Sequence, residues 1–237
     1  MKTIGIIQPG RLGDIIICLP IAKHYADLGY KVIWPIFSQY INMFEEVVDY
    51  VEFIAVTGNI YTCVSEAKHN TINCTKLLDI AATFPGSTCT ERYVEMGDGL
   101  GEIKADHFKY IESEVPIEHK WNLSIKRNSV AEDNLYNQYV TQPDYVVGCL
   151  TSSQGKLDIK FDTKGRQFIE MNENHSIFHW LKILENAKVL ALVNSSVSNL
   201  VEMLNFTTKK ILLPRQDGRL PTLKNEWQNI YPCNKVY

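Results

Sequence analysis

Short apolar runs rich in β-branched residues alternate along this chain with segments of helical periodicity. The first run, residues 4–7, is too short for a typical helix and is typical of a buried strand. Pro9 and Gly10 end it, and Gly10 and Gly13 allow the backbone to turn tightly. A helix is then expected to begin near Asp14. In an open α/β sheet such a turn lies at the carboxyl edge of the strands, where ligands bind.

The same alternation continues along most of the chain and predicts an α/β fold with parallel sheets. Further strands are expected at residues 31–36, 51–56, 144–150, 168–171, 189–193 and 210–214. Further helices are expected at residues 41–48, 105–111, 130–140, 176–186, 198–204 and 226–230.

Residues 60–118 show a less regular pattern. Residues 65–69 and 75–82 are expected to form short helices, and the glycine-rich residues 97–101 are expected to form a loop. Small polar residues and scattered aromatic residues indicate a substrate-facing region with long loops.

The length suits one large domain or two small ones, and either can bury a core. The helix expected over 130–140 ends at Pro143, and a new strand follows, which predicts a domain boundary near residue 140. We therefore expect two Rossmann-like domains, residues 1–140 and 141–237, that face each other across a cleft.

The composition is that of a globular protein, with 45% hydrophobic and 22% charged residues. The net charge of −3 is unevenly divided. Residues 1–143 carry 12 Lys and Arg against 18 Asp and Glu, and residues 144–237 carry 12 against 9. This asymmetry favours a protein that holds an anion in its C-terminal half, and it disfavours a general nucleic-acid binder with a continuous basic face.

Six cysteines occur without a CxxC pair or metal-like spacing, which favours reduced thiols. The chain shows no signal segment and no run of about 20 apolar residues. We therefore expect a cytoplasmic protein without a membrane span.

The turn formed by Gly10, Arg11, Gly13 and Asp14 has too few glycines for a dinucleotide fingerprint and lacks the Gly-Lys-Ser/Thr of a P-loop. Asp14 is read either as a helix cap or as a functional carboxylate. Residues 194–199 follow an apolar strand and precede a helix, so they form either a phosphate cradle or an N-cap. The polar loop at residues 151–156 ends in a lysine that could meet a diphosphate, or it is simply solvated.

Together these turns resemble signature segments of the heptosyltransferase-like family 9 glycosyltransferases. Residues 12–21, Leu-Gly-Asp-Ile-Ile-Ile-Cys-Leu-Pro-Ile, are similar to the family's opening Gly-Asp turn and its proline-containing helix. Residues 193–200 are similar to its C-terminal Asp-Ser/Thr-Gly-x-x-His-Leu turn, and residues 151–156 to its donor-phosphate loop. The chain resembles a divergent, shortened member, and residues 60–118 are unmatched.

The resemblance implies a GT-B fold and an inverting hexosyl-, heptosyl- or pentosyltransferase that uses neither a metal nor a cofactor beyond its nucleotide-sugar donor. It implies that Asp14 is the general base for the acceptor hydroxyl, and that Gly10, Arg11 and Gly13 form the acceptor-side phosphate turn. The residues that would bind the donor are Thr151, Ser152, Lys156, Asn194, Ser195, Ser196 and Asn199.

The donor turn departs from the family pattern. Asn194, Ser196 and Asn199 stand where the family has Asp, Gly and His. A role that depends on charge is lost. The missing glycine also limits how closely a diphosphate can approach the turn. A different donor or weaker donor binding is therefore expected.

Three functions remain open at this stage. The first is a glycosyltransferase with a glycan acceptor. The second is a phage-type DNA glycosyltransferase that acts on hydroxymethylated cytosine. The third is a catalytically silent nucleotide-sugar-binding protein. In the second case the DNA contacts would be Lys126, Arg127, Lys209, Lys210, Arg215 and Arg219.

Overall fold

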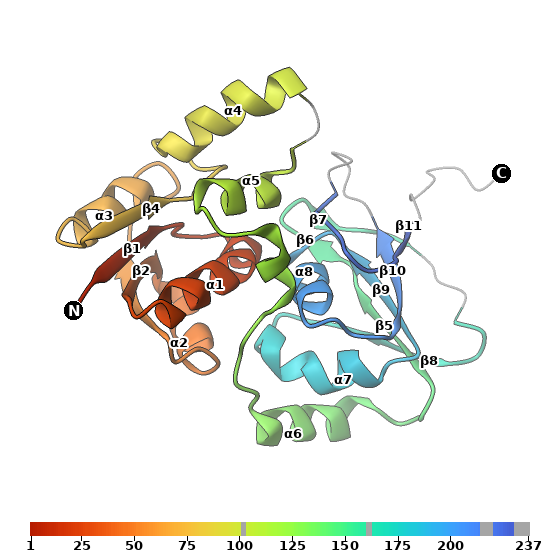
Figure 1. Cartoon of the computed structure of the whole chain (residues 1–237). Coiled ribbons are helices and arrows are strands. Elements are labelled where there is room, and N and C mark those ends of the chain that lie inside the picture. The colour runs from red at the N-terminus through yellow and green to blue at the C-terminus, as the bar shows by residue number, and fades with distance from the viewer. Residues whose placement is uncertain (101–102, 160–162, 214–219, 230–237) are drawn as a thin grey trace. The chain divides into compact units, whose positions relative to one another are not determined.

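The computed structural model describes residues 1–100, 103–159, 163–213 and 220–229. The chain divides into two compact units, Met1–Lys126 and Arg127–Tyr237 (Figure 1). The division precedes the helix at Ser129–Tyr139, so this helix packs in the second unit, whereas the boundary expected near residue 140 places it in the first.

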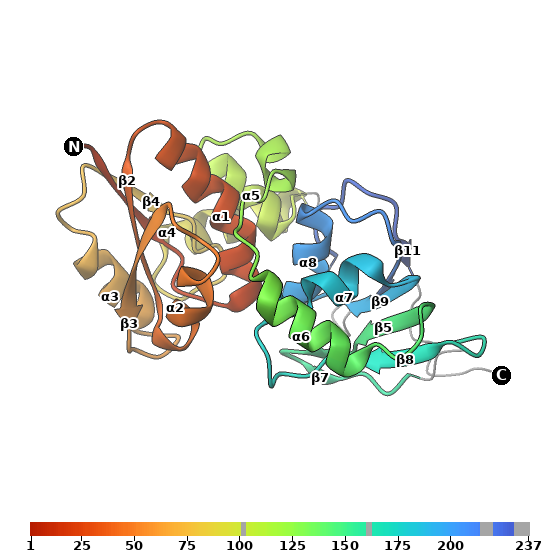
Figure 2. The ribbon, with the colours of Figure 1, turned by 90° about the horizontal axis from the view of Figure 1, so that it is seen from below.

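The first unit contains a parallel sheet with the strand order β3-β2-β1-β4. Its strands are β1 (Thr3–Ile7), β2 (Lys31–Phe37), β3 (Val51–Val56) and β4 (Lys76–Asp79). Its helices are α1 (Leu12–Asp27), α2 (Ser38–Glu45), α3 (Cys63–Asn70), α4 (Thr88–Leu100), α5 (Ala105–Glu112) and the 3₁₀ turn η1 (Ile117–Trp121). Right-handed crossovers place α1 and α3 on opposite faces of the sheet (Figure 2).

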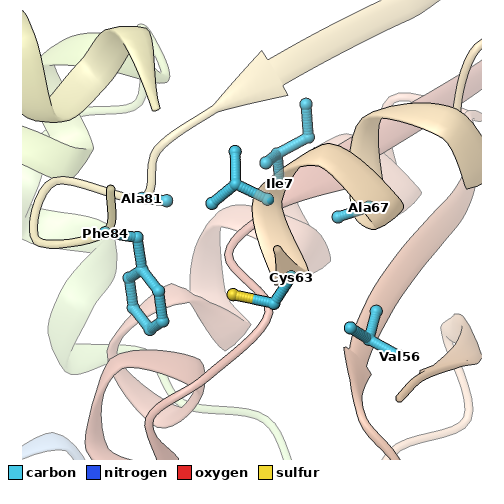
Figure 3. Close-up of a cluster of buried hydrophobic side chains, with 7 residues drawn as sticks. Ile7, Val56, Cys63, Ala67, Ala81 and Phe84 are labelled. Carbon is cyan, nitrogen blue, oxygen red and sulfur yellow. The ribbon is translucent and has the colours of Figure 1, made fainter. Parts of the chain in front are cut away.

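The face of the sheet beneath α3 holds a cluster of buried side chains (Figure 3). Its members are Ile7, Val56, Cys63, Val64, Ala67, Ala81 and Phe84. Burying a large aliphatic or aromatic side chain stabilises a fold by about 1.5–3 kcal/mol. The cluster therefore fixes the carboxyl end of β1 against α3 and against the segment that follows β4.

The helix expected over residues 75–82 is wrong, because residues 76–79 form the edge strand β4, which pairs with β1. Leu78 is buried and Leu77 is exposed, which is the two-residue period of a strand. Pairing with a distant strand decides the structure of this short segment.

The loop expected at residues 97–101 is also wrong for residues 97–100, which continue α4; residue 101 lies outside the described residues. Asp79 holds the start of this helix, because its Oδ2 accepts hydrogen bonds of 3.0 Å from the Thr88 N–H and from Thr88 Oγ1. A carboxylate at a helix N-terminus stabilises the helix, and this one comes from β4 rather than from the local sequence.

The second unit contains a parallel sheet with the order β11-β10-β9-β5-β8. Its strands are β5 (Tyr145–Cys149), β8 (Gln167–Glu170), β9 (Val189–Val193), β10 (Lys209–Leu213) and β11 (Gln228–Asn229), and β6 (Thr151–Ser152) and β7 (Gly155–Lys156) form a separate hairpin. Its helices are α6 (Ser129–Tyr139), α7 (Leu181–Asn186), α8 (Ser196–Met203) and the 3₁₀ turn η2 (Ile177–Trp180).

The helix expected over residues 226–230 is wrong for residues 228 and 229, which pair with Ile211 and Leu212 of β10; residue 230 lies outside the described residues. As with β4, the partner strand rather than the local pattern determines the element.

Both sheets change direction at an inner strand. In the first unit the chain adds β2 and β3 on one side of β1 and then β4 on the other. In the second unit it adds β8 on one side of β5 and then β9, β10 and β11 on the other. Ligands of open α/β sheets bind outside the carboxyl ends of the strands at such switch points. The candidate sites are therefore the ends of β1 and β4, and the ends of β5 and β9.

A buried ion pair joins the start of α5 to η1. Lys120 Nζ lies 2.5 Å from Asp106 Oδ2, and the two side chains are 0% and 6% exposed. Breaking a buried pair by removing one partner costs about 3–5 kcal/mol, because a charge is left buried without compensation.

We expect Lys120→Met to lower the free energy of unfolding by about 3–5 kcal/mol, and Asp106→Leu combined with Lys120→Met to recover most of this loss. Urea unfolding of both variants measures the difference. The matched control is Lys126→Met, which breaks the exposed pair with Asp49 and should leave the free energy of unfolding nearly unchanged, because water screens an exposed pair. Equal losses for Lys120→Met and Lys126→Met would contradict the expectation.

Candidate functional site

Asp14 lies in the first turn of α1, directly after the turn that ends β1. The helix begins at Leu12 with Arg11 as its N-cap residue, and no side chain caps it. The helix-cap interpretation of Asp14 is therefore wrong. Its Oδ1 instead lies 3.3 Å from Lys109 Nζ, and the Asp14 side chain is 19% exposed.

Lys109 comes from α5, and its side chain is 1% exposed. Its ammonium group donates a hydrogen bond to Gln8 Oε1 and one of 3.0 Å to the Ile80 carbonyl, and it faces Asp14 Oδ1 as its third partner. A lysine ammonium has three donors, so these partners account for all of them. Lys109 thereby ties together the carboxyl ends of β1 and β4 and the start of α1, which is the switch point of the first sheet.

The charge state of Lys109 follows from its neighbours. Burial is the largest single influence and lowers the pKa of Lys109, but the charge and hydrogen bond of Asp14, together with the nearby Cys18 and Cys89, outweigh burial, and the net pKa is raised. Burial raises the pKa of the Cys18 and Cys89 thiols to about 12, so both are neutral near pH 7. Asp14 therefore supplies the negative charge that balances the buried ammonium.

The two carboxylate oxygens of Asp14 are in different situations. Oδ1 is held by Lys109, whereas Oδ2 makes no hydrogen bond to any residue in the described part of the chain. A fixed, partly exposed carboxylate with one open oxygen can accept a proton from a hydroxyl group placed at hydrogen-bond distance.

The other residues predicted for this turn surround Asp14. Gly10 is buried against Phe37, and a Cβ atom at Gly10 would lie 2.4 Å from the Phe37 ring, so this position requires glycine. Arg11 is exposed, and its guanidinium carbon lies 5.9 Å from the centroid of the Phe84 ring, within range of a cation–π contact. Gly13 is the second residue of α1. The structure thus brings Gly10, Arg11, Gly13 and Asp14 to one end of β1.

In the second unit, the predicted donor turn lies at the end of β9. The Ser195 N–H donates a hydrogen bond of 3.0 Å to Ser198 Oγ, and Asn199 Nδ2 donates one of 2.9 Å to the Ser195 carbonyl. Ser195 therefore occupies the N-cap position of α8, which begins at Ser196, as the N-cap interpretation expects.

Asn199 also carries a feature that points to a ligand. The residue is 6% exposed, and its Oδ1 is buried without a hydrogen-bond partner among the residues that the structure describes. A buried polar atom without a partner is costly and uncommon. Because an amide oxygen only accepts hydrogen bonds, it fits a hydroxyl or amino group of a ligand.

The second predicted donor loop lies beside this turn. Thr151, Ser152 and Lys156 belong to the β6–β7 hairpin, which follows β5, and β5 is hydrogen-bonded to β9. The two loops therefore meet at the switch point of the second sheet. Lys156 is already engaged there, because its Nζ lies 2.6 Å from Glu170 Oε1 at the end of β8.

Three residues of these sites were missed in the sequence: Gln8, Lys109 and Glu170. Gln8 and Glu170 lie at strand ends, where the switch-point rule could have found them. Lys109 carries no such signal, because a lysine on an amphipathic helix is normally solvent-exposed.

The basic residues considered for DNA binding do not form a free set. Lys126 and Arg127 form ion pairs, and Lys210 is buried and donates a hydrogen bond to the Phe206 carbonyl. Lys209 is exposed, and Arg215 and Arg219 lie outside the described residues. Within the described residues there is also no group of three or more His, Cys, Asp or Glu side chains that could hold a metal ion. No described helix is both long and apolar enough to cross a membrane.

Comparison with known proteins identifies the fold. No protein-family model and no curated protein matches the sequence. Among solved structures, a glycosyltransferase family 9 protein from Veillonella parvula DSM 2008 matches with a TM-score of 0.56 and 10% identity, over 90% of this chain and 80% of that chain. Heptosyltransferase WaaC from E. coli also matches, with TM-scores of 0.47 with ADP and 0.44 with ADP-2-deoxy-2-fluoro heptose, at 12% identity over 98% of this chain and 93% and 92% of those chains. The first match shows that this chain has a fold similar to that of a family 9 glycosyltransferase.

The Asp14–Lys109 pair predicts an unequal effect of two substitutions on stability. Asp14→Asn leaves the buried ammonium without its counter-charge and should lower the free energy of unfolding by about 3 kcal/mol, the lower end of the range for a buried pair because Asp14 is partly exposed. Asp14→Asn combined with Lys109→Met removes both charges and should be the more stable of the two variants. Thermal or urea unfolding checks the order, and a double variant less stable than Asp14→Asn would contradict it.

Proposed function

We propose that this chain is a glycosyltransferase that moves a sugar from a nucleotide-sugar donor to an acceptor hydroxyl, with a glycan as acceptor. The observation that carries the proposal is the open Oδ2 of Asp14 at the switch point of the first sheet. The similarity of the fold to a family 9 glycosyltransferase supports it. Nothing in this proposal depends on a metal ion.

In the proposed reaction, Asp14 acts as the general base. Its carboxylate takes the proton of the acceptor hydroxyl while the hydroxyl oxygen forms a bond to the anomeric carbon of the donor sugar. The bond from that carbon to the nucleoside diphosphate breaks, and the diphosphate leaves with the electron pair. Attack from the side opposite the leaving group inverts the configuration at the anomeric carbon.

The donor is proposed to bind at the switch point of the second sheet. The first N–H groups of α8 and the ammonium group of Lys156 offer positive charge to the departing diphosphate. The unpartnered Oδ1 of Asn199 offers an acceptor to a donor hydroxyl or amino group. The excess of basic residues in the C-terminal half supports this assignment.

The bond between Lys156 and Glu170 has a consequence for the donor. Both side chains are exposed, at 59% and 37%, and an exposed ion pair is worth no more than about 1 kcal/mol. A diphosphate can therefore displace Glu170 from Lys156 at small cost. The residues at positions 194, 196 and 199 favour a second candidate, a nucleotide-sugar-binding protein that transfers no sugar, because they depart from the donor turn of the family that the chain resembles.

Sugar transfer by an Asp14→Asn variant separates the two candidates. General-base removal should lower kcat by about 10²–10⁴-fold while a nucleotide sugar still raises the melting temperature of the protein. Measurements at temperatures where the variant is folded exclude an effect of lost stability. Transfer that continues undiminished would refute Asp14 as the base, and donor binding without transfer to any acceptor would favour the silent protein.

A thermal-shift panel of nucleotide sugars that gives no shift would refute the donor site.

The proposed replacement of Glu170 by a diphosphate as the partner of Lys156 gives a further prediction. Lys156→Ala should weaken nucleotide-sugar binding about 10-fold or more, whereas Glu170→Gln should strengthen it, because the lysine is then free to meet the diphosphate. Isothermal titration calorimetry measures both. Lys182→Ala is the matched control, since it breaks another surface ion pair, between Lys182 of α7 and Asp133 of α6. Weaker nucleotide-sugar binding by the Glu170→Gln variant would contradict the proposal that the diphosphate replaces Glu170 at Lys156.

A further inference from the structure

We infer that Lys109 is the positioning residue of Asp14: it holds one carboxylate oxygen so that the other is presented to the acceptor hydroxyl. This inference rests on the proposed function. Lys109 is itself too deeply buried to touch a substrate, so it would act through Asp14 alone.

The geometry of the ammonium group supports this role. Its partners come from the end of β1, from the residue after β4 and from the first turn of α1, so its position is fixed by three separate elements. Gln8 is held in turn by two hydrogen bonds. Its side-chain Nε2 donates one to the Gly10 carbonyl, and its main-chain carbonyl accepts one of 3.0 Å from Trp34 Nε1. A cation fixed in this way defines where Asp14 Oδ1 lies.

Stability alone does not account for a lysine at this position. Replacing a buried ion pair by apolar residues of similar volume is often neutral or stabilising, so an apolar side chain at position 109 beside an apolar side chain at position 14 would support the fold as well. A partly exposed carboxylate at position 14 is what makes a buried cation useful, because the cation restricts the rotation of the carboxylate.

The charges around Lys109 support a role in orienting the Asp14 carboxylate. Among the described residues, the charged group that acts on Lys109 is Asp14 from α1, while Cys18 and Cys89 are neutral thiols. The contribution of Lys109 is to hold the Asp14 carboxylate in one orientation.

A double-mutant cycle in kcat tests the inference. Lys109→Met should lower kcat by ~10- to 100-fold, which is the range typical of removing a residue that orients a metal ligand in a metalloenzyme. The KM for the donor should be unchanged, because the donor is proposed to bind in the second unit. In the Asp14→Asn background, Lys109→Met should lower the residual kcat no further, since the side chain that it positions is gone. A kcat for Lys109→Met within twofold of the wild type, or an equal loss in both backgrounds, would overturn the inference.

Lys120→Met is the matched control for lost stability. Lys120 is the other fully buried lysine of this unit that is paired with an aspartate, and its partner is Asp106 rather than Asp14. At a temperature where both variants are folded, Lys120→Met should keep the wild-type kcat, and a loss equal to that of Lys109→Met would assign the effect to the fold and overturn the inference.

A second variant covers the case in which Lys109→Met does not fold. Gln8→Leu removes one acceptor of the ammonium group and leaves the ion pair, and it should lower kcat several-fold with an unchanged donor KM, but not in the Asp14→Asn background. An unchanged kcat would overturn the inference. If Asp14→Asn itself transfers sugar at the wild-type rate, the proposed base fails, and this outcome is distinct from a failure of Lys109.

Discussion

An ammonium group that has lost its water must find three acceptors and a counter-charge within the protein, because burying an unpaired ion costs several kcal/mol. Lys109 imposes this requirement on the first unit. The acceptors come from Gln8, Asp14 and Ile80, which lie far from Lys109 in the sequence and on three different elements. The convergence of β1, α1 and β4 at the switch point is therefore held by charge as well as by the apolar cluster around Ile7 and Phe84.

The strands of both sheets were predictable where they form apolar runs with clear ends, as at residues 31–36 and 189–193. The expectations failed at β4 and β11, which are short and lie at sheet edges. Residues 76–79 and 228–229 contain too few apolar positions to show a period, so their structure depends on pairing with a distant strand. The helix α4 was missed for a related reason, because Asp79 of β4 holds its first turn.

The candidate sites were predictable in part, because the switch-point rule places residues that directly follow particular strands. It located Asp14, the hairpin that contains Lys156 and the turn that contains Asn199. The burial of Lys109 could not be predicted from the sequence. It lies 101 positions from its partner Gln8, and the local sequence of a helix does not distinguish a buried lysine from an exposed one. The cleft expected between the two domains stays a prediction.

The two lysines at the switch points differ in what a ligand can do to them. Lys109 is fully buried and bound by three groups, so it cannot exchange its partners. Lys156 is exposed and bound to one carboxylate, and a pair of this kind is weak enough for a phosphate to replace it. A fixed cation suits a carboxylate that must keep one orientation through every turnover, and an exchangeable cation suits a diphosphate that must arrive and leave. The placement of the fixed cation beside Asp14 and of the exchangeable cation beside the α8 turn therefore agrees with the proposed acceptor chemistry in the first unit and the proposed donor binding in the second.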